Sequence, residues 1–260
     1  MEICFCIPCI VCGQPSDLMA GFDPFDGALL VDKPPGMTSH DVVYKIRRGF
    51  QLNKVGHCGT LDPGATGLLI LVIGRATKLS DRIMGGDKTY EGIIRFGVTT
   101  ESYDADGLVV ATLPVPPMTR EEIAAHAAGF QGDLLQTPPM VSAVKIGGVP
   151  LYKMARKGVE VERKARLVRI FSFDVLAYAE PDAQVRIAST KGTYVRSLAH
   201  DLGQKAGCGA HLKSLRRTAS GKYDVKDALP LAQLLALPLS ELEKRVIPFL
   251  TLSQNEQPAA

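Results

Sequence analysis

Short runs of apolar residues alternate along the chain between the spacing of strands and the spacing of helices. Alternating or continuous apolar positions predict strands at residues 28–32, 88–97, 107–112, 167–178, 184–190 and 211–218. Apolar residues three or four positions apart predict helices at residues 75–84, 119–128, 195–206 and 227–237. The run Leu68–Ile73 fits either a buried strand or a segment of a buried helix. Because strands and helices do not alternate regularly, we expect an α+β fold with a largely antiparallel sheet.

A further helix and two loops complete the pattern. Ser39 is predicted to be the N-cap of a helix, because an apolar face of helical spacing follows it. Residues 54–67 are rich in glycine and predict a loop. Residues 137–166 are a second, basic loop segment interrupted by proline and glycine. We therefore expect a leader over residues 1–27, a main domain over 28–225, and a C-terminal helix with a flexible tail over 226–260.

The composition is that of an ordinary globular protein. Of the 260 residues, 46% are hydrophobic and 22% are charged, which is enough apolar material for a core. No apolar run approaches the ~20 residues that a membrane-spanning helix needs, so we predict no membrane partner. The net charge of +3 is unevenly placed, because residues 1–26 contain four acidic and no basic side chains. The rest of the chain is mildly basic and suits an anionic partner.

Four of the six cysteines, Cys4, Cys6, Cys9 and Cys12, lie in the leader. Their spacing could hold a metal ion or an iron–sulfur cluster. The alternatives are an unstructured leader, or a start of translation further along the chain. Elsewhere the sequence has no paired zinc-ligand spacing and no glycine-rich nucleotide motif, so we predict no metal and no cofactor. The absence of a disulfide framework favours a reduced, cytoplasmic protein.

The segment GHCGTLDPGATG presents one carboxylate, Asp62, and one imidazole, His57, in a glycine-rich loop. Glycine lets a backbone approach a ligand closely, and Pro63 keeps Asp62 out of helical geometry. A stiff loop with a single carboxylate is a candidate platform for a nucleophile. Taken alone, the loop favours the simpler interpretation, in which Asp62 forms an Asx turn or a helix cap.

Two more segments contain candidate site residues. In KTYEG, Tyr90 begins a predicted strand, where it is either a core aromatic or part of a site. In KGTYVRSLAHDLG, Tyr194 and Arg196 alternate at a strand-to-helix junction, which places both on one face if the strand extends that far. Arg196 is then a surface cation, a partner for Asp201, or a guanidinium that keeps a partly buried carboxylate ionised.

Together these segments resemble one family, the TruB-type tRNA pseudouridine synthases, which act on uridine 55 of the tRNA T-loop. The matching strings span residues 28–225 in the order of that family: LLVDKPPGMTSHDVV, GHCGTLDPGATGLL, IGRATKL, DKTYEG, TESYDADG, STKGTYVRSLAHDLG and GCGAHLKSLRRTASG. The resemblance implies the pseudouridine synthase fold, with a mixed, mostly antiparallel sheet flanked by helices and loops. It also implies an isomerase.

The resemblance implies roles for individual positions. Asp62 matches the catalytic aspartate. Tyr90 matches the tyrosine that stacks on the target base and is proposed to act as a base. Arg196 matches the arginine that pairs with the aspartate. Tyr194 and Leu215 match pocket residues. His57 matches the histidine associated with the flipped-out nucleotides, and Lys78 matches a lysine near the active site.

The implied chemistry fits these residue types. Isomerisation breaks the N1–C1′ bond of uridine and joins C5 of the base to C1′, which changes no redox state and imports no group. It requires a carboxylate near C1′, acting as a nucleophile or as a base for a sugar proton, and the sequence does not choose between these routes. The uridine must leave its stack at a cost of a few kcal/mol, which stacking on Tyr90 offsets in part. Arg196 is expected to lower the pKa of Asp62 against the rise due to burial.

Basic residues are concentrated where the family has a thumb insertion that closes over the RNA arm. Between Lys145 and Arg169 there are eight basic and two acidic residues, Lys145 and Lys153 among them. Such a loop is also compatible with a solvated surface. Further candidates for phosphate contacts are Lys213, Arg216 and Arg217. Phosphate contacts would give salt-dependent affinity for the T-arm of tRNA.

The sequence departs from the family pattern in three places. Cys58 stands where threonine is commoner, and Gly64 stands where a larger apolar residue is usual, which would loosen the loop. The segment after residue 225 is too short for the PUA domain of many relatives, so we expect a stand-alone, monomeric enzyme without guide RNA or obligate protein partner. Two competing hypotheses are a non-catalytic protein that binds tRNA and helps it fold, and a cysteine-ligated metal protein.

Overall fold

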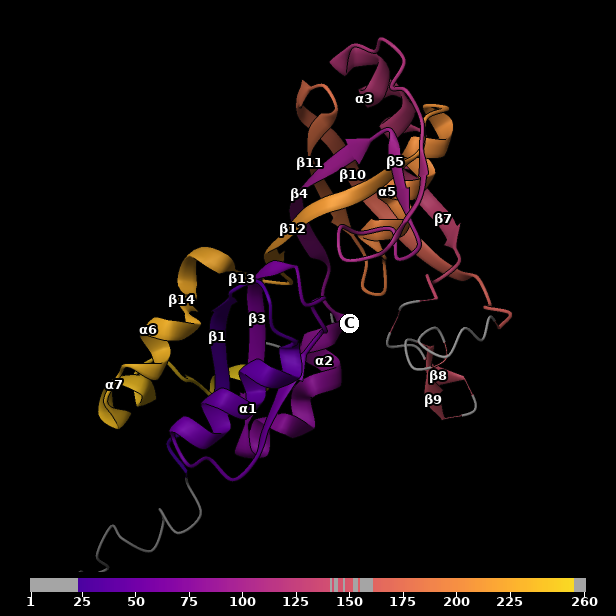
Figure 1. Cartoon of the computed structure of the whole chain (residues 1–260). Coiled ribbons are helices and arrows are strands. Elements are labelled where there is room, and N and C mark those ends of the chain that lie inside the picture. Colours follow the sequence, from indigo (N-terminus) through magenta and orange to yellow (C-terminus); the bar gives the residue numbers. More distant parts are fainter. Residues whose placement is uncertain are drawn as a thin grey trace, which may run out of the picture.

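A single large sheet organises the molecule. The structure is a computed structural model that describes residues 23–254 except 141, 143–144, 147, 152–153 and 155–160. Its eleven-stranded sheet has the order β14-β1-β3-β12-β4-β11-β10-β7 (Figure 1). Three short strands lie off this path: β2 pairs with β3, β13 with β12, and β15 with β1. The pairs β1–β14 and β3–β12 are parallel and the other pairs are antiparallel. The predicted α+β class with a mostly antiparallel sheet is confirmed.

The elements follow one another in this order. The strands of the large sheet are β1 (Gly27–Lys33), β2 (Val55–Cys58), β3 (Thr66–Ile73), β4 (Lys88–Phe96), β7 (Gly132–Gln136), β10 (Arg166–Ala179), β11 (Asp182–Ser189), β12 (Ala210–Ser220), β13 (Tyr223–Asp224), β14 (Leu229–Pro230) and β15 (Ile247–Pro248). Two small hairpins are β5 (Val98–Thr100) with β6 (Val109–Thr112), and β8 (Lys145–Ile146) with β9 (Val149–Pro150). The helices are α1 (Ser39–Gly49), α2 (Ser80–Gly85), α3 (Arg120–Ala128), α5 (Val195–Lys205), α6 (Leu231–Leu235), α7 (Leu239–Glu243) and α8 (Phe249–Gln254), with 3-10 turns η1 (Gly74–Leu79) and η2 (Val225–Asp227).

The sheet joins two halves, each with its own core. In the first half, strand β3 is buried on both faces: Leu69 and Leu71 pack towards α1 and α6, and Leu68 and Ile70 pack towards η1, α2 and α8. The run Leu68–Ile73 is therefore a strand enclosed on both sides. In the second half, α3 and α5 cover β4, β10 and β11. Strand β12 lies between β3 and β4 and belongs to both halves (Figure 1).

Several local predictions are wrong in detail. The N-cap of α1 is Thr38, which forms a capping box with Asp41, and Ser39 is the first helical residue. The predicted loop 54–67 contains β2, and the predicted helix 75–84 is divided between η1 and α2. Strand β7 was not predicted. Its five residues follow no strict alternation, and pairing with β10 makes it a strand.

The segment after residue 225 also differs from the prediction of one helix and a tail. It forms η2, β14, α6, α7, β15 and α8, and both β14 and β15 pair with β1. The core on one face of the first half includes Leu231, Leu234, Leu242 and Val246. Leu252 is fully buried in the core on the other face. Tertiary packing of these short apolar segments replaces the single helix that their local spacing indicates.

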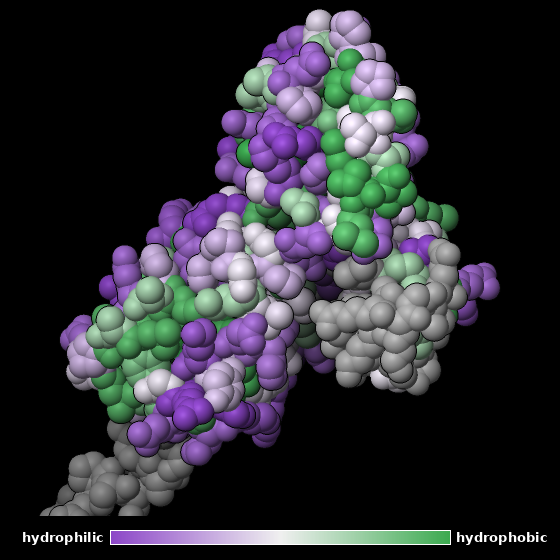
Figure 2. Space-filling model, viewed as in Figure 1, coloured by the Kyte–Doolittle hydropathy of each residue, from purple (hydrophilic) through white to green (hydrophobic). Residues whose placement is uncertain are grey.

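The surface of the described residues is mixed, and Figure 2 shows apolar atoms on both halves of the molecule. The exposed side chains of β6 and its flanks gather on the second half of the molecule, where green atoms cover the β5–β6 hairpin (Figure 2); they include Leu108, Val109, Val110 and Leu113. No helix among the described residues is long and apolar enough to cross a membrane.

Some sequence predictions fall outside the described residues. These are Cys4, Cys6, Cys9 and Cys12 in the leader, Lys153, and the side chain of Lys145 on β8.

Candidate active site

Most of the predicted site residues meet in one cleft where the two halves join. The cleft has a volume of about 590 Å³. Its walls come from the loop between β2 and β3, from β4 and β12, and from the start of α5. Its lining includes six residues singled out in the sequence, Asp62, Tyr90, Tyr194, Arg196, Leu215 and Arg217. Tyr194 and Arg196 lie on the N-cap and first turn of α5 rather than on an extended strand, and both still line the cleft.

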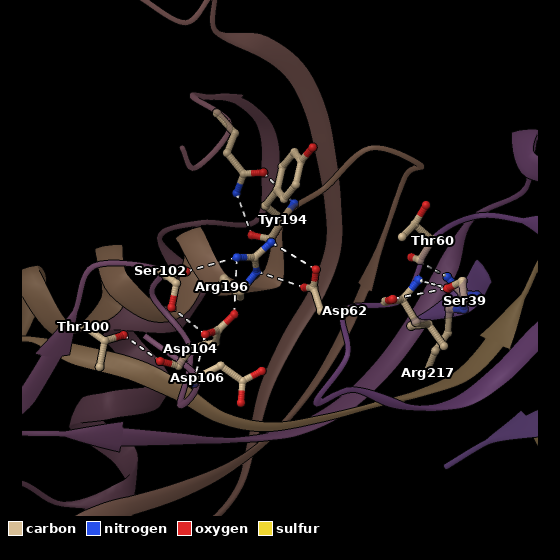
Figure 3. A network of polar contacts seen from close by, with 12 residues as sticks. Ser39, Thr60, Asp62, Thr100, Ser102, Asp104, Asp106, Tyr194, Arg196 and Arg217 are labelled. Carbon is tan, nitrogen blue, oxygen red and sulfur yellow. Dashed lines mark hydrogen bonds and ion pairs between the residues drawn. The ribbon is translucent and has the colours of Figure 1, made fainter. Parts of the chain in front are cut away.

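The carboxylate of Asp62 is held by the guanidinium of Arg196 in a bidentate pair. Arg196 Nε lies 2.9 Å from Asp62 Oδ2, and Nη2 donates to Asp62 Oδ1 at 3.2 Å. The same guanidinium donates to the Ser102 carbonyl at 3.1 Å, and Nη1 lies 3.3 Å from Asp104 Oδ2. Figure 3 shows Arg196 between the two carboxylates. This planar arrangement orients Asp62 as well as neutralising it.

Asp104 is itself fixed by the turn that precedes it. Ser102 Oγ donates to Asp104 Oδ1 at 2.5 Å, and Thr100 Oγ1 donates to the Asp104 carbonyl at 2.6 Å. The intervening Tyr103 has a left-handed φ of 63° and stacks on His200, with 3.9 Å between ring centroids. Asp104 was not singled out in the sequence, because only its position beside Arg196 in space reveals its role.

Burial and charge act on Asp62 in opposite directions. Desolvation in the cleft raises the pKa of Asp62, the Arg196 guanidinium lowers it, and the neighbouring Asp104 and Asp106 carboxylates raise it. The balance is a pKa above the usual value for aspartate. Arg196 therefore opposes the rise, as predicted, but does not reverse it. Of the Asp62 side chain, 40% is exposed, so the carboxylate is open to a ligand in the cleft.

The loop that presents Asp62 is tied down by buried polar side chains. Ser39 Oγ accepts from the Leu61 amide at 2.9 Å and donates to the Leu61 carbonyl at 3.2 Å. The fully buried Lys33 donates from Nζ to the carbonyls of Pro63 at 3.1 Å and Ala65 at 2.6 Å. Burial lowers the pKa of Lys33 to about 8. These contacts make the loop a rigid platform, as predicted from Pro63, rather than the looser loop expected from Gly64.

Tyr194 is held through its backbone. The buried side chain of Gln136, at the end of β7, accepts from the Tyr194 amide at 2.7 Å and donates to the Tyr194 carbonyl at 3.1 Å. Tyr194 caps α5 without a side-chain hydrogen bond of its own, so Gln136 supplies the capping contact. The structure thus adds Gln136 to the site, although nothing in its sequence context indicated this.

Other predicted site residues lie elsewhere or have other partners. His57 is on β2 and is not part of the cleft wall; its Nδ1 is buried without a hydrogen-bond partner, and burial lowers its pKa. Lys78 is exposed on η1 and also lies outside the cleft wall. Arg216 forms a bidentate pair with Asp32, at 3.0 and 2.7 Å.

Arg217 does not fit the predicted phosphate contact. Its side chain is 1% exposed, and its guanidinium donates to the carbonyls of Leu68 at 2.8 Å and Gly59 at 3.0 Å. The sequence places it beside Arg216 in a basic run. The alternation of β12, however, turns Arg217 inward, so charge alone was a misleading signal.

The two departures from the family pattern have local consequences. Cys58 is a buried residue at the end of β2. A Cβ added at Gly64 would approach Asp106 Oδ2 to 3.2 Å, so the missing side chain leaves space beside that carboxylate. A small pocket of about 50 Å³ lies here, between the Asp62 loop and β12. Within the described part of the chain, no cluster of three or more His, Cys, Asp or Glu side chains could hold a metal ion.

Comparison with known proteins extends over most of the chain. The family model described as TruB family pseudouridylate synthase (N terminal domain) matches residues 47–195. The model described as tRNA pseudouridylate synthase B C-terminal domain matches residues 196–250. The chain is 59% identical over 223 residues to tRNA pseudouridine synthase B of Opitutus terrae, which covers 86% of this chain and 92% of that protein.

A more distant relative and a solved structure also match most of the chain. The chain is 47% identical over 230 residues to tRNA pseudouridine synthase B of Dechloromonas aromatica, covering 88% of this chain and 77% of that protein. Among solved structures, it resembles the crystal structure of a Cbf5-Nop10-Gar1 complex with a TM-score of 0.70 and 27% identity. That match covers 92% of this chain and 64% of the solved chain.

Proposed function

Because this chain belongs to the TruB family of pseudouridylate synthases, we propose that it converts uridine 55 in the T-loop of tRNA into pseudouridine. It is an isomerase of the tRNA pseudouridine synthase class, as its close relatives are named. The observation that supports the assignment of the site is the bidentate pair of Asp62 with Arg196 in the open cleft. The sequence motifs around both residues match the family, and the fold brings them together.

Asp62 is the catalytic carboxylate of this proposal. The N1–C1′ bond breaks with its electron pair left on the base, the base turns, and C5 bonds to C1′; C5 then loses its proton and N1 gains one. A carboxylate supports this either by attacking C1′ or by removing a sugar proton, and both routes need the ionised form. Arg196 favours that form and fixes the direction of both Asp62 oxygens. The Ser39 and Lys33 contacts hold the loop so that the carboxylate does not turn away when the nucleotide enters.

The cleft suits a nucleotide that has left its stack. Tyr90 and Tyr194 both line it and supply aromatic surface, and stacking on such a ring is worth ~1–3 kcal/mol per base. Leu215 adds an apolar contact, while Arg166 and Lys191 supply positive charge on the same lining. A flipped uridine is thereby stacked while the phosphates beside it meet cations.

The tRNA T-arm is the RNA partner of this proposal, and the cytoplasm is where that partner is found. The basic segment that contains Lys145 and Lys153 would add phosphate contacts. His57 and Lys78 are proposed RNA contacts outside the cleft wall. The enzyme is proposed to act as a monomer and without guide RNA or a protein partner.

The test is pseudouridine formation on an unmodified tRNA transcript, read by carbodiimide-dependent primer-extension stops. The wild type is compared with Asp62→Asn, which preserves shape, and with Asp174→Asn, an exposed aspartate on β10, as the matched control. We expect a stop at position 55 with the wild type and with Asp174→Asn, and none with Asp62→Asn. A transcript with cytidine at position 55 is the substrate control.

Filter binding on the same proteins separates catalysis from RNA binding. Asp62→Asn is expected to bind the transcript with an affinity within about threefold of the wild type, because phosphate contacts dominate affinity. Product formed by Asp62→Asn would refute the role of Asp62. Binding without product by the wild type would instead favour the tRNA-folding protein.

A further inference from the structure

Tyr103 has a backbone conformation that is unfavourable for its residue type. Its φ of 63° is left-handed, a region that residues other than glycine rarely adopt. Such conformations persist only where the surrounding structure holds them, and they are concentrated at functional sites. Among the described residues, the other non-glycine with a positive φ is Gln51, in the exposed turn that follows α1. The contacts of Tyr103 therefore indicate what its strained backbone serves.

The two neighbours of Tyr103 in the chain both contact Arg196. Arg196 Nη1 donates to the Ser102 carbonyl at 3.1 Å and lies 3.3 Å from Asp104 Oδ2. Figure 3 shows both residues beside the guanidinium. The left-handed residue between them turns the chain, so that a carbonyl before it and a carboxylate after it reach the same cation. On the side of β12 this turn is fixed by its backbone, because the Leu212 amide donates to the Tyr103 carbonyl at 2.9 Å.

The ring of Tyr103 connects the same turn to α5. It stacks on the imidazole of His200, with 3.9 Å between the ring centroids and 16° between the ring planes. His200 lies one helical turn after Arg196, and residues four positions apart share a face of a helix. Helix α5 therefore contacts the turn in two places, through the charge of Arg196 and through the ring of His200.

The stack is the contact that accounts for the imidazole of His200. Its Nδ1 is buried without a hydrogen-bond partner among the described residues. Burial lowers the pKa of His200 against a smaller rise due to Asp201, so the ring is neutral at neutral pH. A neutral imidazole that does not line the cleft is a poor contact for an RNA phosphate. The face of the ring is therefore the part of His200 that matters here.

We propose that Tyr103 and His200 are a pair of positioning residues for the reaction. Their stack holds the turn around Tyr103 against Arg196, and the fixed guanidinium then holds the Asp62 carboxylate in one direction. The inference rests on the proposed function. A long arginine side chain keeps a single geometry only where further contacts support it. The support matters because misplacement of a reacting group by about 1 Å costs up to ~100-fold in rate.

Two substitutions of Tyr103 separate the stack from the backbone conformation. Tyr103→Gly removes the ring but adopts the left-handed φ without strain, so its Tm is expected to stay within about 5 °C of the wild type. Its single-turnover rate on tRNA is expected to fall about tenfold, because the turn is no longer held against Arg196. Its affinity for tRNA is expected to stay within about threefold, since phosphate contacts dominate binding. Tyr103→Phe keeps the ring and is expected to have the rate of the wild type.

A double-mutant cycle tests whether the two rings act as a unit. His200→Ala removes the other half of the stack and is also expected to lower the rate about tenfold. The combined variant Tyr103→Gly/His200→Ala is expected to lose about tenfold and not about 100-fold, because both substitutions remove one contact. The matched control is His126→Ala, a histidine on α3 that does not line the cleft, and it is expected to keep the rate of the wild type.

Several results would overturn the inference. A wild-type rate in Tyr103→Gly would show that the stack does not position the site, and a loss of rate in Tyr103→Phe would show that the ring is not the part that acts. Multiplied losses in the combined variant would mean that Tyr103 and His200 act independently. A rate that falls only together with Tm in both single variants would leave the stack as a general support of the fold. An inactive wild type would refute the proposed function, which is a separate outcome.

Discussion

The substitution Gln136→Leu removes the two hydrogen bonds that hold the backbone of Tyr194 and keeps the volume of the side chain. Gln136 is 4% exposed, so water does not readily replace the amide. Leaving a buried N–H or C=O group without a hydrogen-bond partner costs ~1–3 kcal/mol of stability for each group. The added apolar contact of leucine offsets part of that cost. Tyr194 is half-buried, so we expect the free energy of unfolding to fall by ~2–3 kcal/mol. For a domain of this size that lowers Tm by ~5–10 °C.

The effect on activity follows from the side chains that Gln136 positions through the backbone of Tyr194. Tyr194 is the N-cap of α5, and Arg196 lies in the first turn of the same helix. Loosening the cap moves both side chains relative to Asp62, and misplacement by about 1 Å costs up to ~100-fold in rate. The assay combines thermal unfolding, single-turnover rates and tRNA affinity, with the exposed Gln131→Leu as matched control. The reasoning is refuted if Gln136→Leu keeps the Tm and the rate of that control.

Two further predictions concern pH. Arg196→Gln removes the cation that lowers the pKa of Asp62, so the acidic limb of the rate–pH profile is expected to move to higher pH; an unmoved limb would mean that Asp62 does not titrate in the reaction. The folded-state pKa of Lys33 is lowered from 10.5 to about 8, so between these values the unfolded chain binds more protons and stability rises with pH. The free energy of unfolding of the wild type minus that of Lys33→Met, both from urea unfolding, is therefore expected to rise by up to ~3 kcal/mol from pH 8 to pH 10.5. A difference that does not change with pH would contradict the lowered pKa of Lys33.

The sequence revealed those parts of the site that depend on local pattern. The Gly-Pro loop around Asp62 and the helix after Tyr194 both have short-range signals, and both are present. The ion pair between Asp62 and Arg196 spans 134 positions in the chain. Residue types alone left Arg196 as a surface cation, a partner for Asp201 or the partner of a partly buried carboxylate, and the family resemblance supplied Asp62.

The supporting contacts could not be predicted for a physical reason. Lys33, Ser39, Gln136 and Arg217 act by hydrogen bonds to backbone carbonyls or amides. Any residue supplies those groups, so the partner leaves no trace in the sequence. Ser39 illustrates the resulting error: its hydroxyl suggested a helix cap, whereas it turns inward to the Asp62 loop and Thr38 caps the helix.

The placement of these contacts shows why the position of one half against the other matters for catalysis. The Asp62 loop is held by side chains from β1, α1 and β12, whereas Arg196 and Tyr194 belong to α5 in the second half. Strand β12 is hydrogen-bonded to both β3 and β4, and Leu215 on it packs against the cores of both halves while lining the cleft. A change in packing at Leu215 would therefore shift Asp62 relative to Arg196 without removing a polar group. The geometry of the ion pair thus depends on an apolar side chain as much as on the charges that form it.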